Sequence, residues 1–382
     1  MKLLVLSYKV GWQPSPGQYV TYGGFPMQME TISSLFEQTT VTLLIRAGAA
    51  PGGTQPIYGN NINIFPLPEP SGSDLRRKLA LLAWLPRYLP QLWREIAHAD
   101  AVHAPVPGDI GFLGLLIALF QRKPLFVRHC GTWGDPITLA DKLLLWLLEK
   151  IAGGRNVVLA TGGAELPPSA KNSHIRWIFS TTMTQAEIAS IRPAAPWDGR
   201  STLRLVTVGR VTHEKNMAAI LEALPAVCEK IPNLHLDILG DGEALPALQH
   251  LAAKLQLSNL VTFHGNVNHT RVLEILSQSH LFVFPTRTKE GFPKAVLEAL
   301  ACGLPVIATR VSVIPQLLNN GSGRLLDDTS APGVAEAVLQ ISSNPAHMAN
   351  MGRLARDVAQ GYTLEAWGAA IGEHLQKAWN IK

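Results

Sequence analysis

The chain has 382 residues, of which 47% are hydrophobic and 16% are charged, and it carries a net charge of +5 with a pI near 9.1. This length suits two domains of about 190 residues, each large enough for its own core. The three cysteines (Cys130, Cys228 and Cys302) have the spacing of neither a metal site nor a disulfide framework, which favours a reducing compartment. Nucleic-acid binding is not expected, because no basic run is interleaved with aromatic residues.

In the first half of the chain, apolar runs alternate with helical patterns, as in α/β proteins with a parallel sheet. The run at residues 1–8 is too short for a signal peptide and is followed by polar residues, so we interpret it as a buried strand. Elsewhere no apolar run reaches the roughly 18 residues of a membrane span. The expected strands are 3–7, 41–45, 101–103, 125–128 and 157–160.

Residues 74–94 mix cations with leucine, tryptophan and tyrosine, as helices at a membrane surface do. The cations are Arg76, Arg77, Lys78, Arg87 and Arg94. A core helix packed on the sheet is the alternative, and the sequence leaves both interpretations open. Two very apolar segments follow, 110–120 and 143–148, and for 110–120 we expect a core helix.

The alternation of expected strands and helices is interrupted over residues 181–202, which are polar and rich in turn formers. We expect a linker there. It resumes in a second domain over residues 203–362, followed by a helical segment at 363–382. The expected strands of this domain are 205–208, 234–239, 261–264, 281–285, 306–309 and 323–326. A dinucleotide fingerprint is not expected, because Gly240-Asp-Gly242 lacks the third glycine.

Glu290 and Glu298 flank a corner between an apolar strand and a helix. Pro293 suits the first turn of this helix, and Gly303 suits the left-handed position past its end. Such a corner lies at the carboxyl end of a parallel strand, where open α/β sheets bind ligands.

The start of this helix predicts a site with two kinds of partner. N–H groups near Gly291 and Phe292 would donate to phosphates, whereas Glu290 would accept hydrogen bonds from hydroxyls. A nucleotide sugar has both kinds of group. Two solvated glutamates at an ordinary strand–helix corner would fit the spacing equally well.

Two cations follow an earlier strand of the same domain. Arg210 comes directly after Gly209, and Lys215 comes five residues later. Arg210 and Lys215 would stabilise the negative charge that develops on a departing diphosphate. Taken as isolated residues, they would instead be surface cations paired with Glu214 or Glu222.

Two histidines lie at the ends of expected strands in the first half of the chain. His129 ends its strand and is a candidate contact for the ligand, although a lone histidine is more often structural. His103 is the weaker candidate and fits the end of its strand.

Residues 205–327 resemble the nucleotide-binding half of the family 4 retaining glycosyltransferases, which have the two-domain GT-B fold. Several motifs of that family occur here in the same order. They are Val208-Gly-Arg210 with Lys215, Leu239-Gly-Asp-Gly-Glu243, Phe263-His-Gly265, Glu290 and Glu298 with the run 298–307, and Gly321–Asp327.

The resemblance implies an α/β fold of the GT-B class, with two Rossmann-like domains whose parallel sheets face a central cleft. Residues 1–180 would form the acceptor-side domain and residues 203–362 the nucleotide-sugar-binding domain. The C-terminal helix, residues 363–382, would pack back on the first domain.

The resemblance also implies roles for individual residues. Arg210 and Lys215 would hold the donor diphosphate without a metal or other cofactor, Glu290 would bind sugar hydroxyls, and Glu298 would hold the ribose. His129 would contact the sugar from the other domain. The expected catalytic residues are Glu290, Arg210, Lys215 and His129, and the expected donor-binding residues are Gly23, Gly24, Gly209, Gly291, Phe292, Pro293 and Glu298.

The chain departs from the family pattern at several places. Asn216 follows Lys215 where the family usually has glycine, and residues 311–316 replace a Gly-Gly-x-x-Glu element. Arg128 and Trp133 stand near His129 in place of small polar residues. An Asn-Gly-Val-Asp element near the linker is missing, with residues 179–183 in its place.

The expected function is transfer of a sugar from a nucleotide diphosphate sugar to an acceptor hydroxyl with retention, in the assembly of cell-surface polysaccharide or glycolipid. The acceptor would be a glycan or a lipid-linked molecule. The protein would be cytoplasmic, with peripheral contact to an anionic inner membrane face through residues 74–94. The alternatives are a nucleotide-sugar epimerase or hydrolase of the same fold, and a non-catalytic scaffold.

Overall fold

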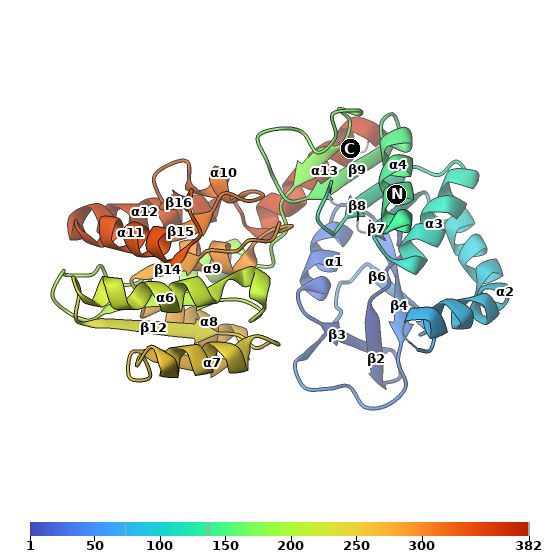
Figure 1. The fold of residues 1–382 in the computed structure, drawn as a ribbon. Helices are drawn as coiled ribbons and strands as arrows, with labels where there is room; N and C mark the ends of the chain where they lie inside the picture. Colours follow the sequence, from blue (N-terminus) through green and yellow to red (C-terminus); the bar gives the residue numbers. More distant parts are fainter. Residues whose placement is uncertain (73, 135, 137, 381–382) are drawn as a thin grey trace. The chain divides into compact units, whose positions relative to one another are not determined.

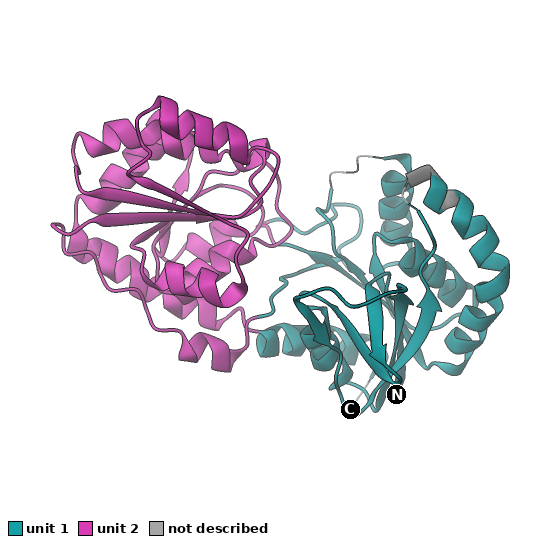
Figure 2. Ribbon diagram, turned by 90° about the horizontal axis from the view of Figure 1, so that it is seen from below, with its two compact units in different colours: residues 1–162, 166–182, 364–382 teal, residues 163–165, 183–363 magenta. Residues whose placement is uncertain are grey.

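The computed structural model describes residues 1–72, 74–134, 136 and 138–380. The chain divides into two compact units (Figure 2). Unit 1 contains residues 1–162, 166–182 and 364–382, and unit 2 contains residues 163–165 and 183–363. Residues 381–382 of the predicted C-terminal segment lie outside the described residues.

Unit 1 is built on a ten-stranded sheet (Figure 1). Its order is β10 (Arg176–Ile178), β9 (Asn156–Thr161), β8 (Leu125–His129), β7 (Ala101–Val106), β1 (Lys2–Val5), β4 (Gln38–Ile45), β2 (Val10–Ser15), β3 (Gln18–Tyr22) and β5 (Thr54–Pro56), and β6 (Ile62–Pro68) pairs with β4. The strands from β10 to β4 are parallel. The antiparallel β2–β3 pair is not among the expected strands, and it includes the exposed residues Gln13, Pro14 and Ser15.

Helices cover both faces of this sheet. They are α1 (Phe25–Ser33), α2 (Asp74–His98), α3 (Asp109–Phe120), α4 (Leu139–Ile151) and α13 (Leu364–Trp379). The helices α1 and α13 share one core with the sheet, and α2, α3 and α4 share the other. Trp367 of α13 is fully buried, and the Arg128 guanidinium lies 5.1 Å from its ring centroid.

Unit 2 has a six-stranded, fully parallel sheet. Its order is β13 (Val261–Gly265), β12 (Leu234–Leu239), β11 (Leu203–Val208), β14 (Leu281–Phe284), β15 (Val306–Thr309) and β16 (Gly323–Leu326). The chain begins this sheet at β11, adds two strands on one side, and then adds three on the other. The order therefore reverses between β11 and β14, the position where doubly wound sheets bind ligands.

The helices of unit 2 also form two layers. They are α5 (Gln185–Ser190), the 3₁₀ turn η1 (His213–Lys215), α6 (Met217–Cys228), α7 (Leu245–Lys254), α8 (His269–Ser277), α9 (Lys294–Ala301), α10 (Ile314–Leu318), α11 (Ala331–Ser342) and α12 (Pro345–Gln360). One core holds α6, α7 and α11, and the other holds α8, α9 and α10. The apolar side chains at helical spacing in α9 (Val296, Leu297, Leu300 and Ala301) are buried in the second core, as their spacing predicts.

Residues 181–202, expected to form a linker, are more ordered than their composition indicates. They contain α5, and Ile188, Ile191 and Trp197 are buried in the cores of unit 2. Proline and glycine in this stretch interrupt regular hydrogen bonding, but they do not prevent single apolar side chains from packing.

The helix α2 includes the segment 74–94 and is amphipathic. Trp84, Leu92 and Ile96 are buried in the core, whereas Leu82 is 66% exposed and Trp93 is 41% exposed. The side chain of Lys78 lies outside the described part. Among the described residues, no helix combines the length and the apolar character needed to cross a membrane.

Candidate functional site

The carboxyl ends of β11 and β14 form the centre of the candidate site. These neighbouring strands pair in parallel, with Leu205 opposite Leu281. The loop after β11 also touches the loop after β12, because a Cβ atom on Gly240 would lie only 1.8 Å from the carbonyl oxygen of Gly209. Only glycine at position 240 permits this approach.

The two predicted cations lie in the connection between β11 and α6. Arg210 is exposed and follows Gly209 directly after the strand. Lys215 ends the turn η1, and its side chain is only 11% exposed. The structure therefore gives the two cations different surroundings, one open to solvent and one enclosed.

Lys215 and Glu290 form an ion pair between the two loops. The Glu290 side chain is 16% exposed, and the Thr286 hydroxyl lies 3.4 Å from the same carboxylate oxygen. The Lys215 ammonium also lies 5.1 Å from the centroid of the Phe284 ring. The sequence identified both charged residues, whereas their direct contact follows from strand pairing and the contact of Thr286 with Glu290 from the fold of their common loop.

The corner after Glu290 differs slightly from the prediction. Pro293 is the N-cap of α9, with φ −80° and ψ 87°, so the helix begins one residue later at Lys294. Gly303 has φ +76°, the left-handed conformation expected past the end of this helix. The carbonyl of Gly291 accepts a hydrogen bond from the Ser312 hydroxyl at 2.8 Å, and this fixes the turn before α9.

Glu298 lies on α9 beside a histidine that the sequence analysis did not identify. Its side chain is 16% exposed, and burial raises the pKa of its carboxyl. His269 Nδ1 lies 3.5 Å from Glu298 Oε1, and His269 Nε2 lies 3.0 Å from Glu187 Oε1. The hydrogen bond to Glu187 raises the pKa of His269. No pattern marks His269, because it is the first residue of an ordinary amphipathic helix.

A pocket of about 330 Å³ adjoins Arg210 at the same edge of the sheet. Its walls include Gly209, Asp241, Asn266 and Val267, from the loops that follow β11, β12 and β13. It is large enough for part of a nucleotide, and it is next to the exposed cation.

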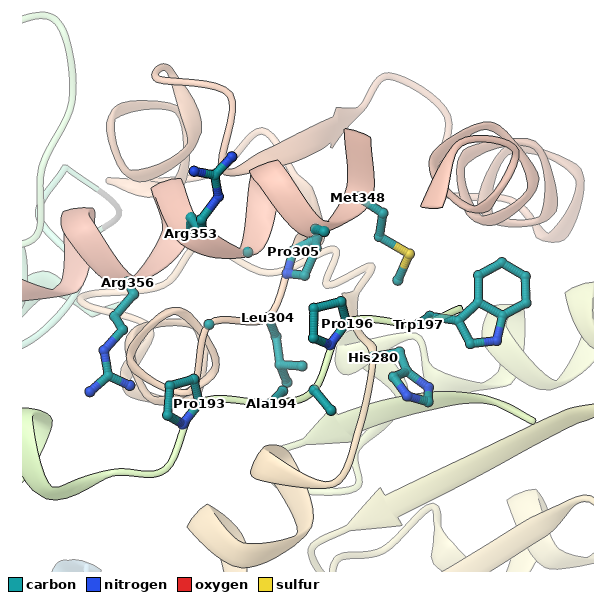
Figure 3. Close-up of a pocket in the computed structure, with 14 residues that line it drawn as sticks. Pro193, Ala194, Pro196, Trp197, His280, Leu304, Pro305, Met348, Arg353 and Arg356 are labelled. Carbon is teal, nitrogen blue, oxygen red and sulfur yellow. The ribbon is translucent and has the colours of Figure 1, made fainter. Parts of the chain in front are cut away.

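A second pocket lies elsewhere in unit 2 (Figure 3). His280 and Pro305, which precede β14 and β15, line it together with Trp197 and Arg353. It is therefore at the amino ends of the strands, away from Lys215 and Glu290, and contains none of the predicted site residues.

In unit 1, His129 is the last residue of β8 and is 6% exposed. Its Nδ1 lies 3.2 Å from the Gly131 carbonyl oxygen, and the Trp133 ring meets it edge-on at 5.2 Å. Burial lowers the pKa of His129, so the neutral ring is favoured at neutral pH. His103 is instead fully buried within β7, and burial lowers its pKa to about 3.

Gly23 and Gly24 lie in the turn before α1. Gly23 has φ +72°, which favours glycine. A Cβ atom on Gly24 would lie 1.8 Å from the Thr182 side chain, so this position has no room for one. Packing within unit 1 is thus enough to explain Gly24, and its predicted role in donor binding stays a prediction.

Over the described residues there is no group of three or more His, Cys, Asp and Glu side chains that could hold a metal ion.

The family model of glycosyl transferases group 1 matches residues 198–358. A phosphatidylinositol N-acetylglucosaminyltransferase subunit of Arabidopsis thaliana is 32% identical over 204 residues, which cover 50% of this chain and 45% of that protein. The GDP-mannose-dependent alpha-(1-6)-phosphatidylinositol monomannoside mannosyltransferase of Mycolicibacterium smegmatis is 28% identical over 183 residues, covering 45% of this chain and 47% of that protein. The chain thus spans about half the length of these curated relatives.

Among solved structures, Anabaena HepE in complex with UDP is similar over 99% of this chain and 100% of its own, with a TM-score of 0.70 and 16% identity. A likeness at this identity establishes the fold alone. Together with the two α/β units, whose sheets are largely parallel in unit 1 and fully parallel in unit 2, it confirms the predicted GT-B fold class.

Proposed function

We propose that the chain transfers a sugar from a nucleotide diphosphate sugar to an acceptor hydroxyl with retention, because residues 198–358 match the family model of glycosyl transferases group 1. The observation that carries this proposal is the ion pair of Lys215 and Glu290 at the topological switch point of unit 2. It places a cation and a hydroxyl-binding carboxylate side by side where doubly wound sheets bind ligands.

The cations act on the leaving group. When the bond between the anomeric carbon and the β-phosphate oxygen breaks, negative charge develops on the diphosphate. Lys215 and the exposed Arg210 stabilise that charge without a metal ion. Retention follows if the acceptor hydroxyl attacks the anomeric carbon from the same face and gives its proton to the departing phosphate.

The carboxylates bind the hydroxyls of the donor. Glu290 accepts hydrogen bonds from the sugar, and the turn formed by Gly291, Phe292 and Pro293 adds backbone groups next to it. Glu298 accepts from the ribose. The pocket beside Arg210 holds the nucleoside, and the relative solved with UDP makes a uridine nucleotide the first to test.

His129, Gly23 and Gly24 are proposed to take part from unit 1. His129 is neutral and has its Nδ1 directed to a carbonyl, so its Nε2 can accept a hydrogen bond from a sugar hydroxyl. Replacing His129 by alanine tests this assignment separately from the residues of unit 2.

The acceptor is proposed to be a glycan or a lipid-linked molecule at the cytoplasmic face of a membrane. Two curated relatives act on phosphatidylinositol compounds according to their names. In unit 1, α2 and α4 expose large apolar side chains beside cations, as membrane-surface helices do. The exposed apolar residues are Leu79, Leu82, Trp93, Leu139, Leu143 and Trp146.

The proposal is tested by a thermal-shift screen against uridine, guanosine and adenosine diphosphate sugars, because a bound ligand raises the melting temperature. Product analysis with the best donor then gives the transferred sugar and its anomeric configuration. Glu290→Ala and Arg210→Ala are each expected to lower turnover by about 10²-fold, whereas Glu229→Ala, at an exposed position, keeps full activity.

Other outcomes favour the other functions. Release of a free or epimerised sugar without any acceptor would indicate a hydrolase or an epimerase. Failure to bind any of the nucleotides would indicate a scaffold. Full transferase activity of both alanine variants would contradict the residue roles.

A further inference from the structure

A buried asparagine lies next to the proposed diphosphate-binding lysine. Asn216 directly follows Lys215, has φ 56° and ψ 32°, and is 5% exposed. Glycine adopts this left-handed conformation most easily, and asparagine tolerates it better than most residues. The backbone alone would be served by glycine, so the buried side chain of Asn216 must be explained by its own contacts.

The side-chain amide of Asn216 joins two other loops. Its Nδ2 donates to the carbonyl oxygen of Pro285 at 3.2 Å and to that of Thr329 at 2.8 Å. Only the NH₂ group can face two carbonyl oxygens, so this chemistry sets the orientation of the amide. Pro285 begins the loop that carries Glu290, and Thr329 lies in the loop between β16 and α11.

Further contacts connect the turn that carries Lys215 to the loop after β14. The backbone N–H of Arg287 donates to the carbonyl of Glu214 at 2.7 Å, and Lys215 pairs with Glu290. The turn that carries Lys215 is thus bonded to the loop after β14 on both sides of the lysine, at Glu214 and at Asn216. A lysine ammonium on its flexible four-carbon stem needs such a fixed backbone to hold one position.

We propose that Asn216 is a positioning residue that fixes Lys215 for binding the diphosphate. This inference rests on the proposed function, in which Lys215 stabilises the leaving diphosphate. Asn216 acts through the backbone of the turn, since its amide donates to the Pro285 and Thr329 carbonyls. Its amide holds Lys215 in place before the ligand arrives, so that little reorganisation is needed on binding.

Asn216→Gly tests this directly, because glycine keeps the left-handed backbone and removes only the amide contacts. The probe is inorganic pyrophosphate, whose dissociation constant is measured by calorimetry. We expect it to rise about tenfold. With the donor that turns over in the product assay, kcat should fall about tenfold while the acceptor KM stays within about twofold. Gln256→Gly is the matched control, because Gln256 is exposed, has φ 61° and lies just past the end of α7.

A double-mutant cycle separates positioning from general loosening of the fold. In a Lys215→Ala background, Asn216→Gly should change pyrophosphate binding by less than about twofold, because the group it positions is gone. A full tenfold loss in both backgrounds, or no loss in either, would overturn the inference while leaving the role of Lys215 intact. Unchanged pyrophosphate binding and turnover in Lys215→Ala alone would refute the proposed role of Lys215 and the inference with it.

Discussion

Single residues decide how the proposed nucleotide site should respond to pH, and His269 is the clearest case. It lies between Glu298 and Glu187, and its positive charge lowers the pKa of the Glu298 carboxyl, which burial raises. Lys294 acts on Glu298 in the same direction as His269. The charged carboxylate is the form that accepts hydrogen bonds from ribose hydroxyls, so nucleotide affinity should fall as pH decreases through the pKa of Glu298.

We predict that His269→Ala moves this loss of affinity to higher pH. Removing the histidine removes a positive charge from beside Glu298, so the carboxyl takes up its proton earlier as pH decreases. The measurement is the dissociation constant of UDP by calorimetry at a series of pH values for both proteins. Protonation of UDP itself is common to both curves and cancels in the comparison. Identical pH dependence in the two proteins would show that His269 does not act on Glu298.

The sequence predicted the charged residues of the site but not most of their contacts. Lys215 and Glu290 were identified from their motifs, yet they are 75 positions apart and meet only because β11 and β14 are neighbours. His269 was missed for a similar reason, since it reaches Glu298 from a different helix. Thr286, in contrast, lies in the same loop as Glu290 and has no feature that distinguishes it from other loop residues. A side chain that comes near the site only through the order of the strands has no local sequence pattern that distinguishes it from an ordinary loop or helix residue.

Among the helices, α13 gives a measurable test of how the end of the chain contributes to unit 1. Trp367 is fully buried in the core that α13 shares with α1, and its ring lies beneath the Arg128 guanidinium. Trp367→Ala should lower the free energy of unfolding of unit 1 by about 3–5 kcal/mol, the usual cost for a buried tryptophan. The buried Arg128 would also lose the aromatic face that stabilises its charge.

Urea unfolding followed by circular dichroism measures this effect, and two transitions are expected where the units unfold separately. Trp379→Ala is the matched control. It removes a partly exposed tryptophan from the same helix, whose Nε1 donates to the Arg155 carbonyl at 2.8 Å. If the two variants were equally destabilised, burial of Trp367 would not be what holds α13.

Element positions were predicted more accurately than their surroundings. All strands expected in unit 2 occur there. The four inner strands β12, β11, β14 and β15 are largely buried apolar runs, as central strands of parallel sheets are. The segment 74–94 shows what the pattern cannot decide. The core interpretation describes one side of α2, which is buried, whereas the other side exposes Leu82 and Trp93, and its contact with a membrane stays a prediction. The outcome depends on neighbouring helices, which the local sequence does not specify.

For the whole molecule, the net charge of +5 and the exposed apolar residues of α4 bear on membrane contact. Leu139 is 74% exposed, Leu143 is 57% exposed and Trp146 is 55% exposed, and the same helix carries Lys142 and Lys150. Apolar side chains gain free energy on leaving water, and anionic lipids attract the lysines. The double substitution Leu143→Glu/Trp146→Glu should therefore reduce binding to vesicles that contain anionic lipid by at least about tenfold, measured by co-sedimentation.

The control for this variant is Gln249→Glu/Ala253→Glu on the exposed side of α7, which changes the net charge by the same amount. If charge alone caused binding, both variants would lose it equally, and raising the salt concentration would abolish binding of the native protein. If α4 inserts apolar side chains, only the first variant should lose most of its binding, and part of the native binding should persist in salt. Turnover with a soluble acceptor should be the same in both variants, because neither changes the residues around Lys215 and Glu290.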